Sequence, residues 1–328
     1  MSRMRLPLVL LPALLLPSCF LFQSTDAKVD HAALTKRSHQ AETAMSEQDW
    51  ETAVQLFDEV LSADPENVPA WIGLGDAYGE MGEWDRAEPA FAQACTRAPE
   101  SYEAQFGHGL SLQMLDRLVE AVAAYHRAMT IDPLSSEASL GIATSYMELD
   151  EPQHALPFAR RAVELAPDDG RAWLSLGAAE EQSGHDKEAL EAYLAASERI
   201  ELAPELMHNL LYAYARARRY HEVIGTARSM IDSGILPSAE AWERMAWAYF
   251  RLGQYDESAE AYREAVDTSP QMWQAWNGLG VNAVNRWLLS ERQDAAAQEE
   301  AVVAFARSLQ IKPDQPKVAQ LVNQYGLQ

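Results

Sequence analysis

A fixed spacing of 34 residues is the feature of this sequence that most limits its fold. Five alanines recur at this spacing, at Ala53, Ala87, Ala121, Ala155 and Ala189. Aromatic residues keep the same phase at Phe57, Phe91, Tyr125 and Tyr193, and prolines recur at Pro65, Pro99, Pro133 and Pro167. A repeat of this length is one small unit that cannot bury its apolar residues alone and must stack on its neighbours. We therefore expect one continuous stack, although an ordinary globular chain of 328 residues would divide into about two domains.

The second unit indicates which local structure repeats. Helical spacing on a first helix places four residues on one face, namely Trp71, Leu74, Gly75 and Tyr78. A second helix follows with an inner stripe of Ala87, Phe91 and Ala94, and Pro99 ends it. This pattern resembles the tetratricopeptide repeat, a helix–turn–helix unit. The resemblance implies an all-α, right-handed α-solenoid in which small residues let paired helices approach and aromatic rings fill the gaps.

The sequence divides into about eight such units. They are expected to begin near Leu34, Val68, Tyr102, Ser136, Gly170, Pro204, Ala239 and Trp273. Pro89 and Pro157 are expected in the first turn of a second helix, where proline is tolerated. In the eighth unit the spacing from Pro270 to Pro313 is 43 residues, and its Ala-, Gln- and Glu-rich insertion favours longer helices. The predicted boundaries are a repeat region over 32–315 and a C-terminal capping helix within 316–328.

The N-terminus has the pattern of an export signal. Arg3 and Arg5 precede an apolar run over 6–16, which leads into Leu16-Pro17-Ser18-Cys19. This end resembles the lipobox of bacterial lipoproteins, which implies a signal peptide over 1–18, acylation of Cys19 and a tether over 19–31. Phe20 after the cysteine resembles lipoproteins sorted to the outer membrane, facing the periplasm. An uncleaved anchor or an ordinary secretory signal is the alternative.

Composition and motif searches exclude several function classes. The chain has 26 Lys and Arg against 49 Asp and Glu, a net charge of −23, which repels nucleic acids and anionic membrane surfaces. Two cysteines cannot form a disulfide framework, and Cys95 is expected to be an inert, half-buried thiol. The eight histidines show no metal-ligand spacing, and no phosphate-binding loop or catalytic constellation is present. We expect no enzyme activity, no metal and no cofactor, and membrane contact only through the N-terminal lipid.

The concave face of the predicted solenoid is where ligand contacts are expected. In the repeat family, ligands contact the first helix of each unit at its second, fifth, sixth, ninth and twelfth to thirteenth positions. In units two to five these positions give an apolar groove of Ile72, Phe106, Leu110, Met114, Leu140, Met147 and Leu174. In units six to eight they give an aromatic and basic set of His208, Asn209, Tyr212, Arg216, Arg244, Trp247, Arg251 and Asn277.

Charge follows the same division along the chain. Residues 204–251 hold six arginines against five acidic residues, whereas the rest of the chain is strongly acidic. Such a locally cationic groove suits an extended peptide with acidic groups or a C-terminal carboxylate. The alternative is that these arginines pair with neighbouring acids or point into solvent.

Together these features predict a lipid-anchored scaffold that binds protein partners at the bacterial cell envelope. Pilotin-like assembly factors for a pilus or secretion machine and adaptors for cell-wall enzymes are analogies at the level of fold. A self-assembling structural protein, in which the solenoid forms a homo-oligomer, is the alternative from another class.

Overall fold

The computed structural model describes residues 31–201 and 203–327, and these form helices joined by short turns. The seventeen helices in this part of the chain are α1 (His31–Ser46), α2 (Trp50–Ala63), α3 (Val68–Glu80), α4 (Trp84–Arg97), α5 (Tyr102–Met114), α6 (Leu118–Ile131), α7 (Ser136–Glu148), α8 (Pro152–Leu165), α9 (Gly170–Gln182), α10 (Asp186–Ser197), α11 (Pro204–Arg216), α12 (Tyr220–Asp232), α13 (Ala239–Arg251), α14 (Tyr255–Thr268), α15 (Trp273–Leu289), α16 (Ala295–Ile311) and α17 (Pro316–Tyr325). The first helices of units two to eight begin at the seven residues predicted for them, and only α1 begins earlier, at His31 instead of Leu34.

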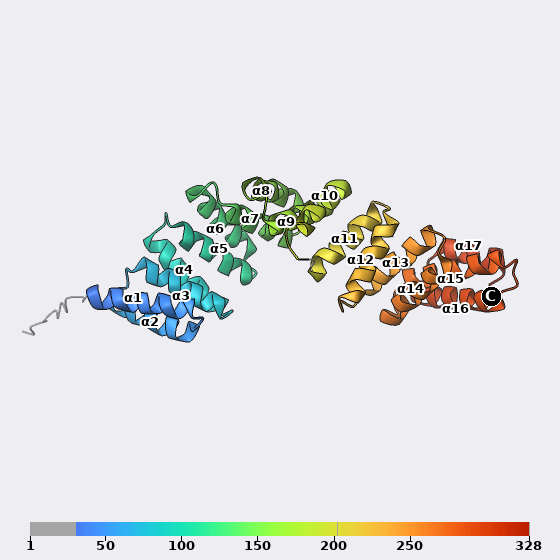
Figure 1. Ribbon diagram of the computed structural model, residues 1–328, viewed down its shortest axis with the longest axis horizontal. Coiled ribbons are helices and arrows are strands. Elements are labelled where there is room, and N and C mark those ends of the chain that lie inside the picture. Colours follow the sequence, from blue (N-terminus) through green and yellow to red (C-terminus); the bar gives the residue numbers. More distant parts are fainter. Residues whose placement is uncertain (1–30, 202, 328) are drawn as a thin grey trace, which may run out of the picture.

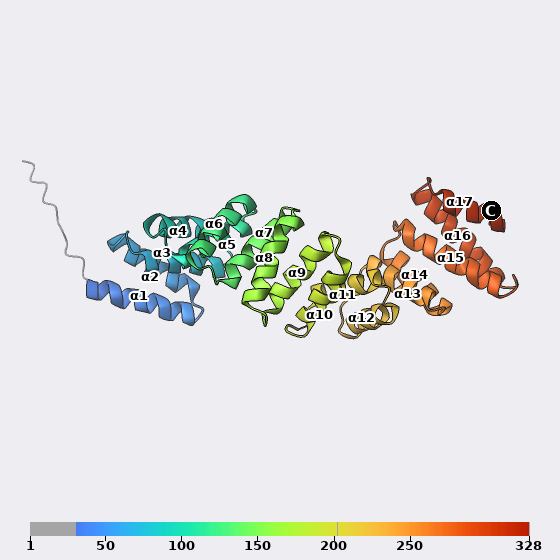
Figure 2. The ribbon, with the colours of Figure 1, turned by 90° about the horizontal axis from the view of Figure 1, so that it is seen from above.

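The helices form a single bowed row. Figure 1 shows α1 and α17 at opposite ends, and Figure 2 shows each helix pair following the last without returning on it. Successive first helices pack on one another from α1 and α3 through α13 and α15, whereas no comparable contact joins successive second helices among the described residues. The first helices therefore lie closer together and form the inner, concave face. The prediction of an all-helical repeat solenoid is confirmed.

Short polar side chains determine where the first helices begin. Asn67, Ser101 and Ser135 each accept a hydrogen bond from a backbone N–H in the first turn of the helix that follows. These caps satisfy one of the N–H groups that a helix start leaves without a partner. The second helices instead follow a residue with positive φ, which reverses the chain; Gly82 and Asp116 are examples.

The core repeats one device, an aromatic ring held between two glycines. The ring of Phe91 on α4 lies against Gly75 on α3 of its own unit and Gly107 on α5 of the next. A Cβ atom added to Gly75 would lie 2.8 Å from Phe91 Cε2, and one added to Gly107 would lie 2.3 Å from Phe91 Cε1. Tyr125 occupies the same place between Gly109 and Gly141 one unit later. The predicted role of the small residues is thus confirmed at these positions, and the rings join neighbouring units into one core.

A recurring set of side-chain hydrogen bonds reinforces the junctions between units. Trp71 Nε1 donates a hydrogen bond of 2.8 Å to the carbonyl oxygen of Pro65, and Arg97 Nε donates one of 2.7 Å to the same oxygen. The guanidinium of Arg97 also stacks 5.3 Å from the Trp71 ring centroid. The fifth unit repeats the arrangement with Trp173, Pro167 and Arg199. The tryptophan and proline of the repeat therefore have a shared structural role that spacing alone did not reveal.

The prediction for two internal prolines was wrong in detail. Pro89 and Pro157 are the sixth residues of α4 and α8, one turn further in than expected. Both side chains are exposed on their helices. Each proline lacks the N–H that would bond to the carbonyl four residues earlier, yet neither helix ends there, because packing of its apolar face outweighs the lost bond.

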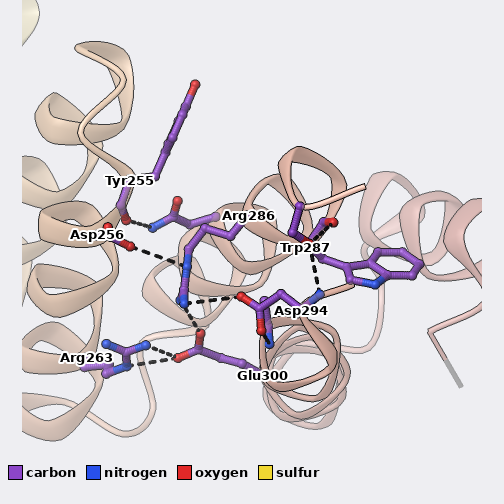
Figure 3. Close-up of polar contacts among 10 residues, drawn as sticks. Tyr255, Asp256, Arg263, Arg286, Trp287, Asp294 and Glu300 are labelled. Carbon is purple, nitrogen blue, oxygen red and sulfur yellow. Dashed lines mark hydrogen bonds and ion pairs between the residues drawn. The ribbon is translucent and has the colours of Figure 1, made fainter. Parts of the chain in front are cut away.

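The last unit is enlarged as predicted, because α15 and α16 are each 17 residues long. A charged cluster joins this unit to α14 (Figure 3). Arg286 on α15 approaches Glu300 at 3.1 Å, Asp256 at 3.6 Å and Asp294 at 3.7 Å, while Arg263 on α14 donates to Glu300 at 2.6 Å. The predicted capping helix is α17, which packs on α16.

The predicted signal peptide, Cys19 and nearly all of the predicted tether lie outside the described residues. Within 31–201 and 203–327, no helix combines the length and apolar character needed to cross a membrane.

Candidate functional site

A hollow on the inner face lies at its N-terminal end. It is a groove of about 900 Å³ walled by α1, α3 and α5, with Trp50 and Trp84 contributed by the starts of α2 and α4. A smaller hollow of about 410 Å³ adjoins it and shares Ile72 and Asp76 among its lining residues. We call the two together the N-terminal groove. Because first helices form its walls, it lies where repeat register places ligand contacts.

The predicted apolar residues are only partly brought together there. Ile72, Phe106 and Leu110 line the N-terminal groove. Met114 at the end of α5 is 53% exposed and lies outside its lining. Leu140 and Met147 pack on the α7–α9 core, and Leu174 packs on the α10–α11 core. The strip therefore continues past the groove as half-buried core residues.

Four carboxylates of the same groove were missed by the sequence reasoning. They are Glu42, Asp76, Glu80 and Glu103, and no lysine, arginine or histidine lines the groove with them. The signal was present in the sequence, because Glu42 and Asp76 occupy the ninth position of their units, Glu80 the thirteenth and Glu103 the second. The predicted apolar groove included only the apolar residues at these positions, so it did not include the acidic residues that give the groove its charge.

Asp76 is partly desolvated within this groove. Its side chain reaches solvent at the groove surface, yet the groove walls remove much of its hydration. This desolvation, together with the negative charge of Glu80 four residues later, raises the pKa of Asp76 to about 6. No described residue gives either carboxylate a hydrogen bond or an ion pair. The groove therefore holds charge that the protein itself does not neutralise.

The predicted cationic residues lie on α11, α13 and α15, and several are already engaged. Arg216 pairs with Glu181 at 3.2 Å and Asp186 at 2.8 Å. Asn277 donates to Gln315 and accepts from the Ser308 hydroxyl, so both ends of its amide are bonded. For these two residues the structure favours the alternative of internal pairing.

Other members of this set remain accessible. The Arg251 guanidinium stacks 5.1 Å from the Trp247 ring centroid and 5.2 Å from that of Tyr220, with no carboxylate partner in the described chain. Arg244 has only the adjacent Glu243 at 3.6 Å. His208 donates to the Pro204 carbonyl at 2.7 Å. Half-buried Asn209 and Tyr212 complete the set on α11, and burial raises the pKa of Tyr212.

Groups that could support chemistry are sparse in the part of the chain that the structure describes. No cluster of three or more His, Cys, Asp or Glu residues there could hold a metal ion. Burial raises the pKa of the Cys95 thiol to about 11, so it stays protonated at neutral pH and is a poor nucleophile.

Comparison with known proteins agrees with the repeat assignment. Tetratricopeptide repeat family models match residues 44–106, 140–205 and 239–272. Tetratricopeptide repeat protein 7B of Homo sapiens is 29% identical over 150 residues, which are 45% of this chain and 16% of that protein. The chain thus spans about a sixth of the length of this relative.

Solved structures support the same fold. A tetratricopeptide repeat protein from Parabacteroides merdae has a TM-score of 0.54 at 12% identity, covering 76% of this chain and 99% of that one. A chain of the APC/C hetero-tetramer Cut9–Hcn1 has a TM-score of 0.50 at 18% identity, covering 92% of this chain and 56% of that one. At these identities the likeness concerns the fold alone.

Proposed function

Because the chain carries tetratricopeptide repeats, units that bind protein or peptide partners, we propose that it is an interaction scaffold that holds a partner segment along its concave face. The observation that carries this proposal is the N-terminal groove. It exposes Ile72, Phe106 and Leu110 beside Asp76 and Glu80, two carboxylates with no hydrogen-bond or ion-pair partner among the described residues. A concave surface that combines apolar area with a few polar groups is the usual form of a binding site.

Photo-crosslinking in the source cell tests this proposal. A photoreactive phenylalanine analogue replaces Leu110 in the groove or, as a control, exposed Glu164 on the second helix α8. We expect a discrete adduct from position 110 and none from position 164. Adducts of equal yield from both positions, or none from the groove, would refute binding in the groove. An adduct between two copies of this chain would favour the self-assembling alternative.

The surface on α11 and α13 remains a proposal for a second contact, favoured by Arg251. Its guanidinium is displayed on two aromatic rings with no carboxylate partner among the described residues, so it is free to bind an acidic segment. Replacing Arg244 and Arg251 by glutamate should reduce crosslinking from an analogue at Tyr212 and leave crosslinking from position 110 unchanged. Undiminished crosslinking at position 212 would contradict this contact.

We also propose that Cys19 carries the lipid that tethers the scaffold to the bacterial envelope, at the outer membrane facing the periplasm. The support is the sequence Leu16-Pro17-Ser18-Cys19 after a basic and apolar start. In cells given a clickable palmitate analogue, the wild-type chain should be labelled and should fractionate with outer membranes. Cys19→Ser should be unlabelled. Label on the variant, or none on the wild type, would contradict acylation at this residue.

A further inference from the structure

The N-terminal groove gathers four carboxylates in one hollow. At two other sites a carboxylate between helices has basic partners: Glu88 pairs with Arg117 and His108, and Glu180 pairs with Arg160 and His185. The groove carboxylates instead lie together on α1, α3 and α5 with no basic residue among the lining side chains, and only Glu42 has a basic neighbour, the exposed His39 at 3.5 Å. Like charges within low-dielectric walls concentrate a negative potential in the hollow, which attracts cations.

The tryptophans give an independent observation that points to the same ligand charge. Five of the nine carry a cation of this chain over the ring, namely Trp71, Trp173, Trp247, Trp273 and Trp287. Trp50 and Trp84, the two that line the groove, have no such cation among the described residues. Both side chains are half-buried in the groove wall, and an aromatic ring in such a wall attracts a lysine or arginine that enters the hollow.

We propose that the N-terminal groove selects an extended partner segment that carries lysine or arginine side chains. This inference rests on the proposed scaffold function and specifies the chemistry of the partner. The cationic heads are bound by Asp76 and Glu80, while the aliphatic stems and neighbouring apolar residues cover Ile72, Phe106 and Leu110. A segment rich in acids is excluded from this groove by repulsion from its four carboxylates.

Ionisation of the groove carboxylates makes the affinity for a cationic segment depend on pH. The pKa of Asp76 is raised to about 6 by desolvation and by Glu80, and Glu42 from α1 and Glu103 from α5 face the same hollow. Below this pH Asp76 is mostly neutral and attracts a cation less. Affinity for a lysine-bearing segment should therefore rise as pH increases from about 5 to about 7.

Fluorescence anisotropy on the purified full chain tests the charge selection with three labelled peptides of roughly ten residues. In the first, lysine alternates with leucine and alanine; in the second, norleucine replaces lysine; in the third, glutamate replaces it. The groove variant is Asp76→Asn with Glu80→Gln. The matched control is Glu260→Gln with Glu264→Gln, which removes two exposed acids at the same helical spacing on α14. Thermal unfolding checks that both variants are folded.

We expect the lysine peptide to bind about tenfold or more tightly than the other two, and the groove variant to lose about tenfold in affinity. The control variant should stay within about twofold of the wild type. Equal binding of the norleucine peptide, an equal loss in the control variant, or no binding of the lysine peptide would each overturn the inference. The crosslink from position 110 separates failure of the scaffold function from failure of the charge selection. If that crosslink forms but the peptides show no charge preference, the scaffold function stands and only the selection of lysine or arginine fails.

Discussion

Gly107→Ala probes the contact that joins neighbouring units and shapes the groove. Gly107 is the sixth residue of α5, and a Cβ atom there would lie 2.3 Å from Cε1 and 2.6 Å from Cζ of Phe91. The Phe91 ring cannot move away freely, because it is 3% exposed and already in close contact with Gly75 on its other side. The added methyl group must therefore displace a helix or force the ring from its preferred rotamer.

The expected magnitude follows from two opposing effects. Replacing glycine by alanine within a helix stabilises it by about 1 kcal/mol, whereas overpacking a core costs about 1–3 kcal/mol or more. Gly225→Ala is the matched control, because Gly225 is also the sixth residue of its helix, α12, and a Cβ atom there would meet nothing within 4 Å. The gain in helix propensity is common to both variants, so they should differ in unfolding free energy by the overpacking cost alone, about 1–3 kcal/mol, with Gly225→Ala the more stable.

Urea denaturation together with hydrogen exchange measures this difference. Exchange is needed because stacked repeats can unfold in parts, and the loss should be concentrated in α4 and α5. Adding Phe91→Leu to Gly107→Ala should recover part of the lost stability by vacating space. If Gly107→Ala is as stable as Gly225→Ala, the close ring contact does not constrain the fold and the argument for an aromatic bridge between units is wrong.

Three further predictions concern charge and backbone strain. Asp76→Asn should raise the unfolding free energy by at most about 1 kcal/mol at about pH 8 and leave it unchanged at about pH 4. The pKa of the wild-type carboxyl is raised from 3.8 to about 6, so its ionisation destabilises the fold as pH rises through that interval. Melting temperatures measured across pH would show this, and a difference that stays constant with pH would contradict it. Glu180→Ala should lower the unfolding free energy by about 1–3 kcal/mol, because Glu180 is only 3% exposed and its carboxylate accepts hydrogen bonds from Arg160 and His185. Chemical denaturation measures this loss, and an unchanged unfolding free energy would mean that these bonds make no net contribution. Arg218→Gly should stabilise by up to about 1 kcal/mol, because Arg218 has a φ of 57°; a less stable variant would show that its side chain makes a contact that outweighs the backbone strain.

Most of the fold could be predicted because the 34-residue period marks both the buried residues and the helix starts. The alanines at one spacing, such as Ala53 and Ala87, are fully buried between helices, so the spacing itself reported the packing. The starts of seven first helices followed from the register, and caps such as Asn67 and Ser101 are local in sequence. What failed was the position of Pro89 and Pro157, because their tolerance depends on packing of the whole helix and not on the turn that contains them.

The site was less predictable because pairing between units depends on distance in space. Register alone placed Arg216 on the inner face, but it could not show that Glu181 and Asp186 lie within reach of its guanidinium. The converse holds at Asp76 and Glu80, whose lack of a basic partner appears only when the surroundings of the groove are known.

The sequence by itself determined the repeat unit, the number and starts of the units and the face on which ligand contacts are expected, because a 34-residue period fixes which side chains point inward. Only the tertiary structure decided which charges are neutralised within the protein and which remain open to a partner. Neutralisation needs opposite charges within about 4 Å, and the approach of one unit to the next sets those distances, so the order of residues alone does not give them.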